Sequence, residues 1–286
     1  MSGEFEMGKH IDKAISEEEK AQGKVLLCCT TAKSDLKINV PGFNQNALPV
    51  RTLPARIENI EIKHDVALLK LALPKAPPFA FYAGQYIDLL LPGNISRSYS
   101  IANSPDQEGI LELHIRKRKN GVCSEMIFGA EPKIKEKGIV RVKGPLGTFT
   151  LQKDSDKPIV LLATGTGYAP IRSILLDLIH QNSERQVHFY WGARQQEDLY
   201  ALEEAEALIG RLKNAKFSPV LSKPDSDWKG ENGYVQNVAA QNYPDLSQYE
   251  VYACGSPAMT ENAQSLLTQN CALPEDAFFC DAFSPA

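Results

Sequence analysis

Residues 159–170 constrain the fold most, because an unbroken apolar run leads there into a glycine-rich turn. Ile159 to Ala163 are all apolar, which is typical of a strand buried on both faces of a parallel sheet. The turn Thr164 to Gly167 follows, and apolar side chains then recur at helical spacing from Ile171 to Ile179. Together they predict a phosphate-binding unit, because glycine lets a phosphate approach the backbone closely. The Rossmann fingerprint does not fit, since Pro170 stands where its third glycine belongs, and a plain tight turn is the alternative.

The rest of the second half repeats this alternation of strands and helices. Strands are predicted at residues 187–191, 217–221, 249–254 and 278–280, and helices at 197–212, 233–240 and 258–269. Such alternation predicts a doubly wound parallel sheet, whose ligands bind at the carboxyl ends of the strands. Three turns at such ends are candidate nucleotide-binding sites: Thr164 to Gly167, Gly192 to Arg194 and Cys254 to Pro257.

Residues 97–100 carry three side chains suited to a flavin dinucleotide. Arg97 can bind a pyrophosphate through two parallel hydrogen bonds. Tyr99 can stack on an isoalloxazine ring, and Ser100 can hydrogen-bond the flavin edge at which a hydride arrives. The motif follows the apolar run 86–92, which predicts a strand that leads into a loop. Ordinary exposed strands also contain this pattern, so its weight depends on the motifs that follow.

A second flavin motif is predicted at residues 114–124. The alternating strand 110–116 leads to a turn at Asn120 and Gly121 and then to a short helix at 124–128, with Ser124 as its N-cap. Free amides at a helix start bind anions, so Gly121 to Ser124 are expected to cradle the FAD pyrophosphate. A hairpin turn and a capped helix are the plain alternative. The basic run 116–119 is interpreted as solvated surface or as a positive field beside the flavin phosphates, and docking of an acidic carrier ranks below both.

From about Pro49 to the C-terminus the chain resembles the ferredoxin–NADP reductase superfamily. Five motifs in the order of that family carry the resemblance: Arg97 to Ser100, Gly121 to Ser124, Gly144 to Gly147, Thr164 to Pro170 and Cys254 to Pro257. The chain is most similar to the NADH-dependent reductases of oxygenase systems and to CDP-6-deoxy-Δ3,4-glucoseen reductases, which the ending 279–283 also resembles. The resemblance implies a β plus α/β fold. An antiparallel FAD-binding β-barrel at 50–153 would precede a doubly wound, parallel-sheet NAD(P)-binding domain at 157–286.

The resemblance also implies the site residues. Ser100, Cys254 and Tyr99 would border the hydride transfer as catalytic residues. The cofactor-binding residues that it implies are Arg97, Tyr99, Ser100, His114, Ile115, Arg116, Gly121, Val122, Cys123, Ser124, Thr164, Gly165, Thr166, Gly167, Pro170, Gly192, Arg194, Cys254, Gly255, Pro257 and Phe283. NADH is favoured over NADPH, because Glu197 and Asp198 would repel a 2′-phosphate, although Arg194 could instead bind one.

The amino-terminal segment resembles part of a plant-type ferredoxin domain, which precedes the flavin domain in that branch. Residues 16–38 look like its last third, and Cys28 would be the fourth ligand of a [2Fe–2S] cluster. The other three ligands belong to an upstream Cys-x4-Cys-x2-Cys loop, but no cysteine precedes Cys28. Residues 1–45 are therefore expected to be a ferredoxin remnant or an irregular arm, with a buried apolar strand at 26–29. A cluster is expected only in a full-length form.

Composition and the resemblance together bound the function. A net charge of −4 argues against nucleic-acid binding, and no apolar run is long enough to span a membrane. No signal peptide is evident, and six irregularly spaced cysteines are typical of a reducing compartment, so a cytoplasmic location is expected. The protein is also expected to be a monomer. The resemblance implies an NAD(P)H-dependent FAD oxidoreductase that passes single electrons to an iron–sulfur dehydrase or oxygenase component, or to a small-molecule acceptor. The alternative is a free-flavin or ferric reductase without a protein partner.

Overall fold

The computed structural model describes residues 3–9, 15–39, 48–152 and 154–283. The chain divides into two compact units, residues 1–47 and 48–286. In the first unit, strand β1 (Phe5–Met7) pairs antiparallel with β2 (Thr30–Ala32). Helix α1 (Glu17–Ala21) begins with a reciprocal capping box between Ser16 and Glu19. The described part of this unit thus contains regular elements, and its relation to a ferredoxin domain stays a prediction.

The buried strand predicted at residues 26–29 is wrong. Leu27–Cys29 form a 3-10 turn, η2, and Leu27 is 48% exposed. An apolar run becomes a strand only where a partner strand can pair with it, and here the pairing with β1 begins only at Thr30. The side chain of Cys28 lies outside the described residues, so its role as an iron ligand stays untested.

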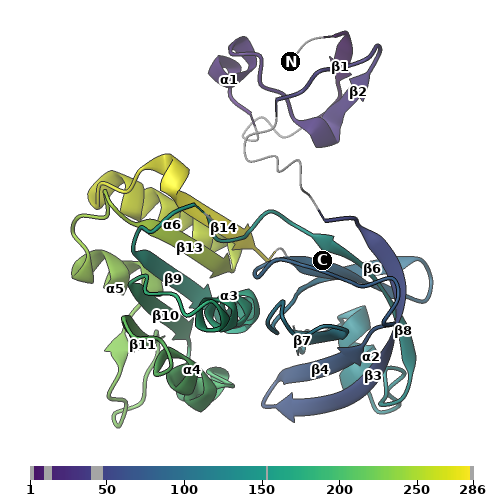
Figure 1. The fold of residues 1–286 in the computed structure, drawn as a ribbon. Coiled ribbons are helices and arrows are strands. Elements are labelled where there is room, and N and C mark those ends of the chain that lie inside the picture. Colours follow the sequence, from purple (N-terminus) through teal and green to yellow (C-terminus); the bar gives the residue numbers. More distant parts are fainter. Residues whose placement is uncertain (1–2, 10–14, 40–47, 153, 284–286) are drawn as a thin grey trace. The chain divides into compact units, whose positions relative to one another are not determined.

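Antiparallel strands form the first half of the second unit. They are β3 (Arg51–Lys63), β4 (Val66–Ala72), β5 (Tyr86–Leu91), β6 (Ile95–Ser100), β7 (Ile110–Arg116) and β8 (Ile139–Leu146), in the spatial order β6-β5-β8-β3-β4-β7. The sheet curls on itself (Figure 1). An isolated bridge, Ile101–Leu113, links the chain after β6 to β7 at the opposite edge. Residues 97–100 form the last part of β6, paired with β5, and a loop follows after the bridge at Ile101, as predicted.

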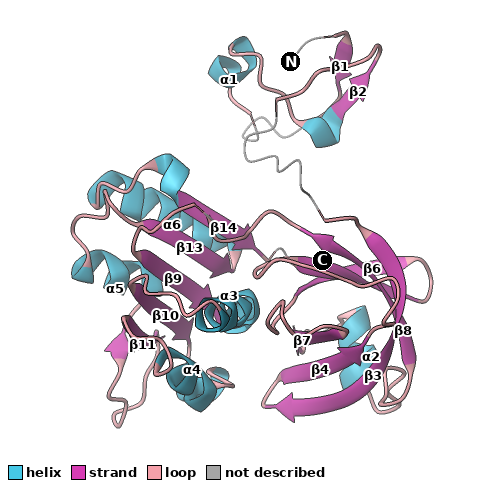
Figure 2. Ribbon diagram, in the orientation of Figure 1, coloured by secondary structure: helices cyan, strands magenta, loops and turns pink. Residues whose placement is uncertain are grey.

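A parallel sheet forms the second half, as predicted. Its strands are β9 (Ile159–Thr164), β10 (Val187–Ala193), β11 (Ala215–Leu221), β12 (Glu231–Asn232), β13 (Glu250–Gly255) and β14 (Phe278–Ala282), in the order β12-β11-β10-β9-β13-β14. Helices α3 (Tyr168–His180) and α4 (Leu202–Ile209) pack on one face, and α5 (Val235–Asn242) and α6 (Pro257–Asn270) on the other (Figure 2). The predicted fold class, an antiparallel barrel followed by a doubly wound parallel sheet, is confirmed.

The helix predicted at residues 197–212 is shorter than expected. A 3-10 turn, η4 (Gln196–Asp198), comes first, and α4 begins only at Leu202. Between them Leu199 and Tyr200 are buried, and the Tyr200 hydroxyl lies 2.8 Å from Nδ1 of His114 in β7. A tertiary contact to the other sheet therefore interrupts a segment whose composition favours helix.

Charged and polar side chains fasten the two sheets of this unit to each other. Arg172 of α3 donates to the carbonyl oxygen of Ala102 at 2.8 Å and pairs with Glu204 of α4 at 2.8 Å. Ser173 donates to the carbonyl oxygen of Asn103 at 2.7 Å. These contacts set the position of the barrel against α3, although the boundaries predicted for the domains stay predictions. Within the described residues, no helix is both long and apolar enough to cross a membrane.

Candidate functional site

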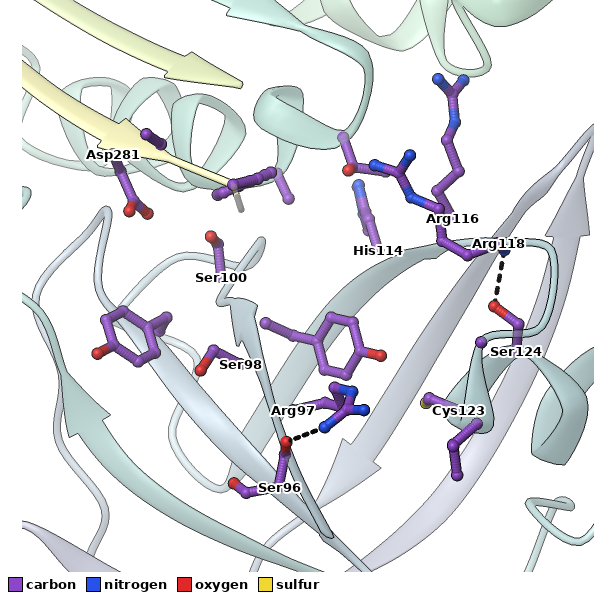
Figure 3. Close-up of a pocket in the computed structure, with 18 of the residues that line it drawn as sticks. Ser96, Arg97, Ser98, Ser100, His114, Arg116, Arg118, Cys123, Ser124 and Asp281 are labelled. Carbon is purple, nitrogen blue, oxygen red and sulfur yellow. Dashed lines mark hydrogen bonds between the residues drawn. The ribbon is translucent and has the colours of Figure 1, made fainter. Parts of the chain in front are cut away.

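A pocket of about 790 Å³ opens where β6, β7 and α2 (Val122–Phe128) face the end of β14 (Figure 3). We call it the flavin pocket. Eleven of the predicted cofactor-binding residues line it: Arg97, Tyr99, Ser100, His114, Arg116, Gly121, Val122, Cys123, Ser124, Thr166 and Phe283. The two flavin motifs, residues 97–100 on β6 and 114–124 on β7 and α2, thus converge on one cavity.

Four basic side chains line this pocket and make it suited to a dianionic pyrophosphate: Arg97, Arg116, Arg118 and Lys119. The guanidinium of Arg97 donates to the carbonyl oxygen of Ser96 at 2.8 Å, and its other nitrogens remain on the pocket side (Figure 3). Together with the backbone at Gly121, which also lines the pocket, this donor set fits the phosphates of FAD.

Tyr99, like Tyr86 and Phe283, has a phenyl-ring side chain that lines the flavin pocket. Burial, followed by the neighbouring Cys123 thiol, raises the pKa of its phenol. Burial also raises the pKa of Cys123, so both groups are neutral at physiological pH. A neutral, amphipathic ring at this position is suited to stacking on a flavin.

Asp281 is a pocket residue that the sequence reasoning missed. It lies on β14 opposite Cys254 of β13, and it faces the same part of the flavin pocket as Ser100 (Figure 3). Burial raises the pKa of its carboxyl group. Its position two residues before Phe283 was the available signal, because both side chains reach the same pocket from the end of one strand.

Ser124 does not cap the helix as predicted. The helix starts at Val122, its N-cap is Gly121, and no side chain accepts a hydrogen bond there. The Ser124 hydroxyl instead accepts from the backbone N–H of Arg118 at 2.7 Å. Ser124 thus fixes the preceding turn, and leaves the first amides of the helix without a side-chain partner in the described structure.

A second pocket, of about 1110 Å³, lies at the carboxyl ends of β9, β10 and β13. We call it the nucleotide pocket. Six of the predicted residues from the three turns line it: Thr164, Gly165, Thr166, Gly192, Arg194 and Gly255. Arg116, Arg118, Thr166 and Phe283 line both pockets, so the two cavities adjoin.

Gly165 has a backbone conformation that glycine favours, with φ of +55°. A Cβ atom there would stand 3.1 Å from the Arg116 guanidinium. Gly255, at φ of +150°, lies so close to the Thr164 hydroxyl that a Cβ atom would collide with it. Both glycines therefore keep the strand ends open for a ligand.

Five predicted cofactor-binding residues line neither pocket: Ile115, Gly167, Pro170, Cys254 and Pro257. The side chain of Ile115 packs in the barrel core. Gly167 is needed for close packing, because a Cβ atom would collide with the Cys254 carbonyl oxygen. Cys254 is fully buried, and burial raises its pKa. Pro170 and Pro257 lie in the first turns of α3 and α6, where proline is tolerated. Direct contact of these side chains with a cofactor stays a prediction that this geometry does not favour.

Arg116 joins the two halves of the site through contacts that the sequence did not reveal. Its guanidinium lies 3.1 Å from the Asp65 carboxylate and 3.8 Å from that of Asp198. His64, Asp65 and Asp198 have ligand atoms within 4.8 Å of one another, but both carboxylates already pair with Arg116, whose positive charge would repel a cation, so this grouping does not favour a metal ion.

Comparison with known proteins assigns the family. The model of the oxidoreductase FAD-binding domain matches residues 55–151, and that of the oxidoreductase NAD-binding domain matches 161–265. The CDP-6-deoxy-L-threo-D-glycero-4-hexulose-3-dehydrase reductase of Yersinia pestis is 41% identical over all of this chain and 85% of its own length. The chain belongs to the FAD- and NAD(P)-binding reductases related to ferredoxin–NADP reductase.

Further relatives agree with this family. The reductase component of propane 2-monooxygenase from Rhodococcus jostii is 33% identical and matches all of this chain and 80% of its own length. The crystal structure of the Amycolatopsis cytochrome P450 reductase GcoB superposes with a TM-score of 0.84 at 29% identity, covering all of this chain and 86% of that one. The protein described by the present structure is thus an NAD(P)H- and FAD-dependent oxidoreductase of the reductase-component type.

Proposed function

We propose that this reductase accepts electrons from NADH on FAD in the flavin pocket and delivers them singly to an iron–sulfur protein, either a dehydrase or an oxygenase component. One observation carries the proposal: the flavin and nucleotide pockets adjoin and share four lining residues. A nicotinamide and a flavin can therefore meet at this boundary. The names of the two relatives, one a dehydrase reductase and one a monooxygenase component, support the class of acceptor.

The residues of the flavin pocket have separate roles in this proposal. Arg97 and the backbone of residues 121–124 bind the pyrophosphate, and Tyr99 provides a stacking face. Ser100 is buried beside Asp281, where it can hydrogen-bond the edge of the ring that faces the nucleotide pocket. FAD supplies the redox chemistry when bound, taking a hydride and releasing electrons one at a time. The protein orients both cofactors and excludes water.

The charge at the end of β10 supports NADH over NADPH. Arg194 is exposed and lines the nucleotide pocket, but Glu197 and Asp198 follow within four residues. We expect kcat/KM for NADH to exceed that for NADPH by about tenfold, a difference of ~1.4 kcal/mol. Steady-state assays with both nucleotides measure this ratio, and Arg194→Ala should lower neither value by more than about twofold. A strong preference for NADPH that Arg194→Ala reverses would show that Arg194 binds the 2′-phosphate.

A protein with this sequence should bind FAD but no [2Fe–2S] cluster. No cysteine precedes Cys28, and a [2Fe–2S] centre needs four ligands. We expect bound FAD with essentially no iron or labile sulfide, efficient electron transfer to ferricyanide, and poor transfer to cytochrome c. Iron and sulfide analysis of the purified protein tests this directly. Stoichiometric iron would show that Cys28 is a working ligand.

The competing function, a free-flavin or ferric reductase, makes a different prediction. Such an enzyme releases the flavin as product, whereas a reductase component keeps FAD bound through turnover. We expect FAD to stay with the protein on desalting and added free flavin to be reduced slowly compared with a one-electron iron–sulfur acceptor. If the flavin is lost on desalting and free flavin is the faster acceptor, the proposal of a protein partner is wrong.

A further inference from the structure

A cluster of buried rings connects a wall of the flavin pocket with the turn that lines the nucleotide pocket. It consists of Tyr168, Trp191 and Tyr200, with His114 at one end, and we call it the ring cluster. Tyr168 and Trp191 stack with centroids 4.3 Å apart and an interplanar angle of 16°. Tyr200 meets Trp191 edge-on at 5.3 Å and His114 edge-on at 5.5 Å. All four rings are buried. Tyr168, Trp191 and Tyr200 line neither pocket, and His114 lines the flavin pocket.

The flavin end of the cluster is His114. Its Nε2 lies 3.0 Å from the Glu112 carboxylate, and its Nδ1 lies 2.8 Å from the Tyr200 hydroxyl. Although Glu112 is partly desolvated, its hydrogen bond with His114 and the nearby Arg172 lower its pKa, so it is a carboxylate that accepts from Nε2–H. Nδ1 then accepts from Tyr200, and burial lowers the pKa of His114, which keeps the ring neutral. His114 itself lines the flavin pocket.

The nucleotide end of the cluster is Trp191. Its indole N–H donates to the backbone carbonyl oxygen of Gly165 at 3.0 Å. Gly165 is the first glycine of the turn at the end of β9, it lines the nucleotide pocket, and its φ is +55°. A buried indole N–H needs a hydrogen-bond partner, and the partner of Trp191 is the backbone of the turn that lines the nucleotide pocket.

We propose that Trp191 and Tyr200 are positioning residues for hydride transfer, which hold the turn 164–167 at a fixed place relative to the flavin pocket. The inference rests on the proposed nucleotide site. It follows from one unbroken set of contacts that links the two pockets. His114 in the wall of the flavin pocket contacts Tyr200, and Tyr200 packs on Trp191. Trp191 donates to the backbone of Gly165 in the nucleotide pocket. Hydride transfer requires reacting atoms held about 3–3.5 Å apart, so a small shift of this turn costs rate more than binding.

Two substitutions remove one hydrogen bond each and keep a ring in place. Trp191→Phe removes the donor to Gly165, and Tyr200→Phe removes the hydroxyl that meets His114. The matched control is Tyr190→Phe, because Tyr190 neighbours Trp191 on β10 but is buried on the opposite face of the sheet, where its hydroxyl accepts from Asn242 at 3.1 Å. All three proteins are tested with FAD bound.

The measurement is the anaerobic reduction of bound flavin by NADH, followed by stopped-flow absorbance. We expect Trp191→Phe and Tyr200→Phe to lower the limiting reduction rate by about tenfold or more and to weaken the long-wavelength charge-transfer absorbance of the nicotinamide–flavin pair. The FAD dissociation constant and the rate of reoxidation by ferricyanide should stay within about twofold of the unchanged protein. Tyr190→Phe should leave all four quantities unchanged.

Three results would overturn the inference. The first is an unchanged limiting rate of flavin reduction in both Trp191→Phe and Tyr200→Phe. If Trp191→Phe does not fold, an unchanged rate in Tyr200→Phe is sufficient to overturn it. The second is an equal loss of rate in Tyr190→Phe, which would indicate a general effect of core substitution. The third is a loss of rate explained entirely by weaker FAD binding. Failure of the proposed nucleotide site is seen separately, as an unchanged nucleotide KM when Gly165 itself is replaced by valine.

Discussion

Replacing Gly165 with valine raises the KM for NADH by about tenfold or more and leaves FAD binding intact. Gly165 has φ of +55°, and a β-branched residue there costs roughly 1–3 kcal/mol of backbone strain. The added side chain also meets the Arg116 guanidinium, because the Cβ position lies 3.1 Å from it. The turn must therefore shift, and the close approach of a phosphate to its backbone is lost.

Steady-state assays with NADH and ferricyanide measure the KM, and a fluorescence titration measures the affinity for FAD. Gly210→Val is the matched control, because Gly210 ends α4 with a right-handed backbone and the nearest atoms to its Cβ position are at ordinary contact distance, 3.5 Å. An unchanged KM for Gly165→Val would mean that this turn does not hold the nucleotide.

The second large effect concerns the flavin. Arg97→Ala removes a charged donor from the flavin pocket, and hydrogen bonds to charged groups contribute about 1.5–3 kcal/mol, so FAD affinity should fall more than about tenfold. Tyr99→Ala removes the stacking face and should weaken FAD binding by about 1 kcal/mol or somewhat more.

Equilibrium dialysis or flavin fluorescence gives the dissociation constants. Arg141→Ala serves as the control, because Arg141 is an exposed arginine on β8 of the same barrel that does not line the flavin pocket. FAD binding that is indifferent to both Arg97→Ala and Tyr99→Ala would remove the basis for placing the flavin in this pocket.

The fold was accessible from the sequence because its signals are local. The apolar run 159–163, the glycine turn behind it and the helical spacing after Pro170 each lie within about a dozen residues, and they specify β9, the turn and α3 without knowledge of the rest of the chain. The convergence of Arg97 and Gly121 on one pocket could also be predicted, since both belong to short motifs suited to the same pyrophosphate.

The features that the sequence did not reveal depend on contacts between distant residues. Tyr200 interrupts the helix expected at 197–212 because it meets His114, 86 positions earlier. Cys254 lies at the predicted carboxyl end of β13, but its side chain is fully buried in the core, which depends on packing against distant residues. The spacing of Asp281 and Phe283 places both on one face at the end of β14, but which pocket that face meets depends on the pairing of β14 with β13. No local pattern records such pairings.

The most direct test of the account is the anaerobic addition of NADH to the purified, FAD-loaded protein. The account predicts that the yellow absorbance of the bound flavin bleaches fully, with roughly one equivalent of NADH for each flavin, because the shared boundary of the two pockets brings nicotinamide and flavin together. Subsequent addition of ferricyanide should restore the absorbance spectrum of the oxidised flavin. A protein that binds FAD in this pocket but is reduced by neither NADH nor NADPH would contradict the account.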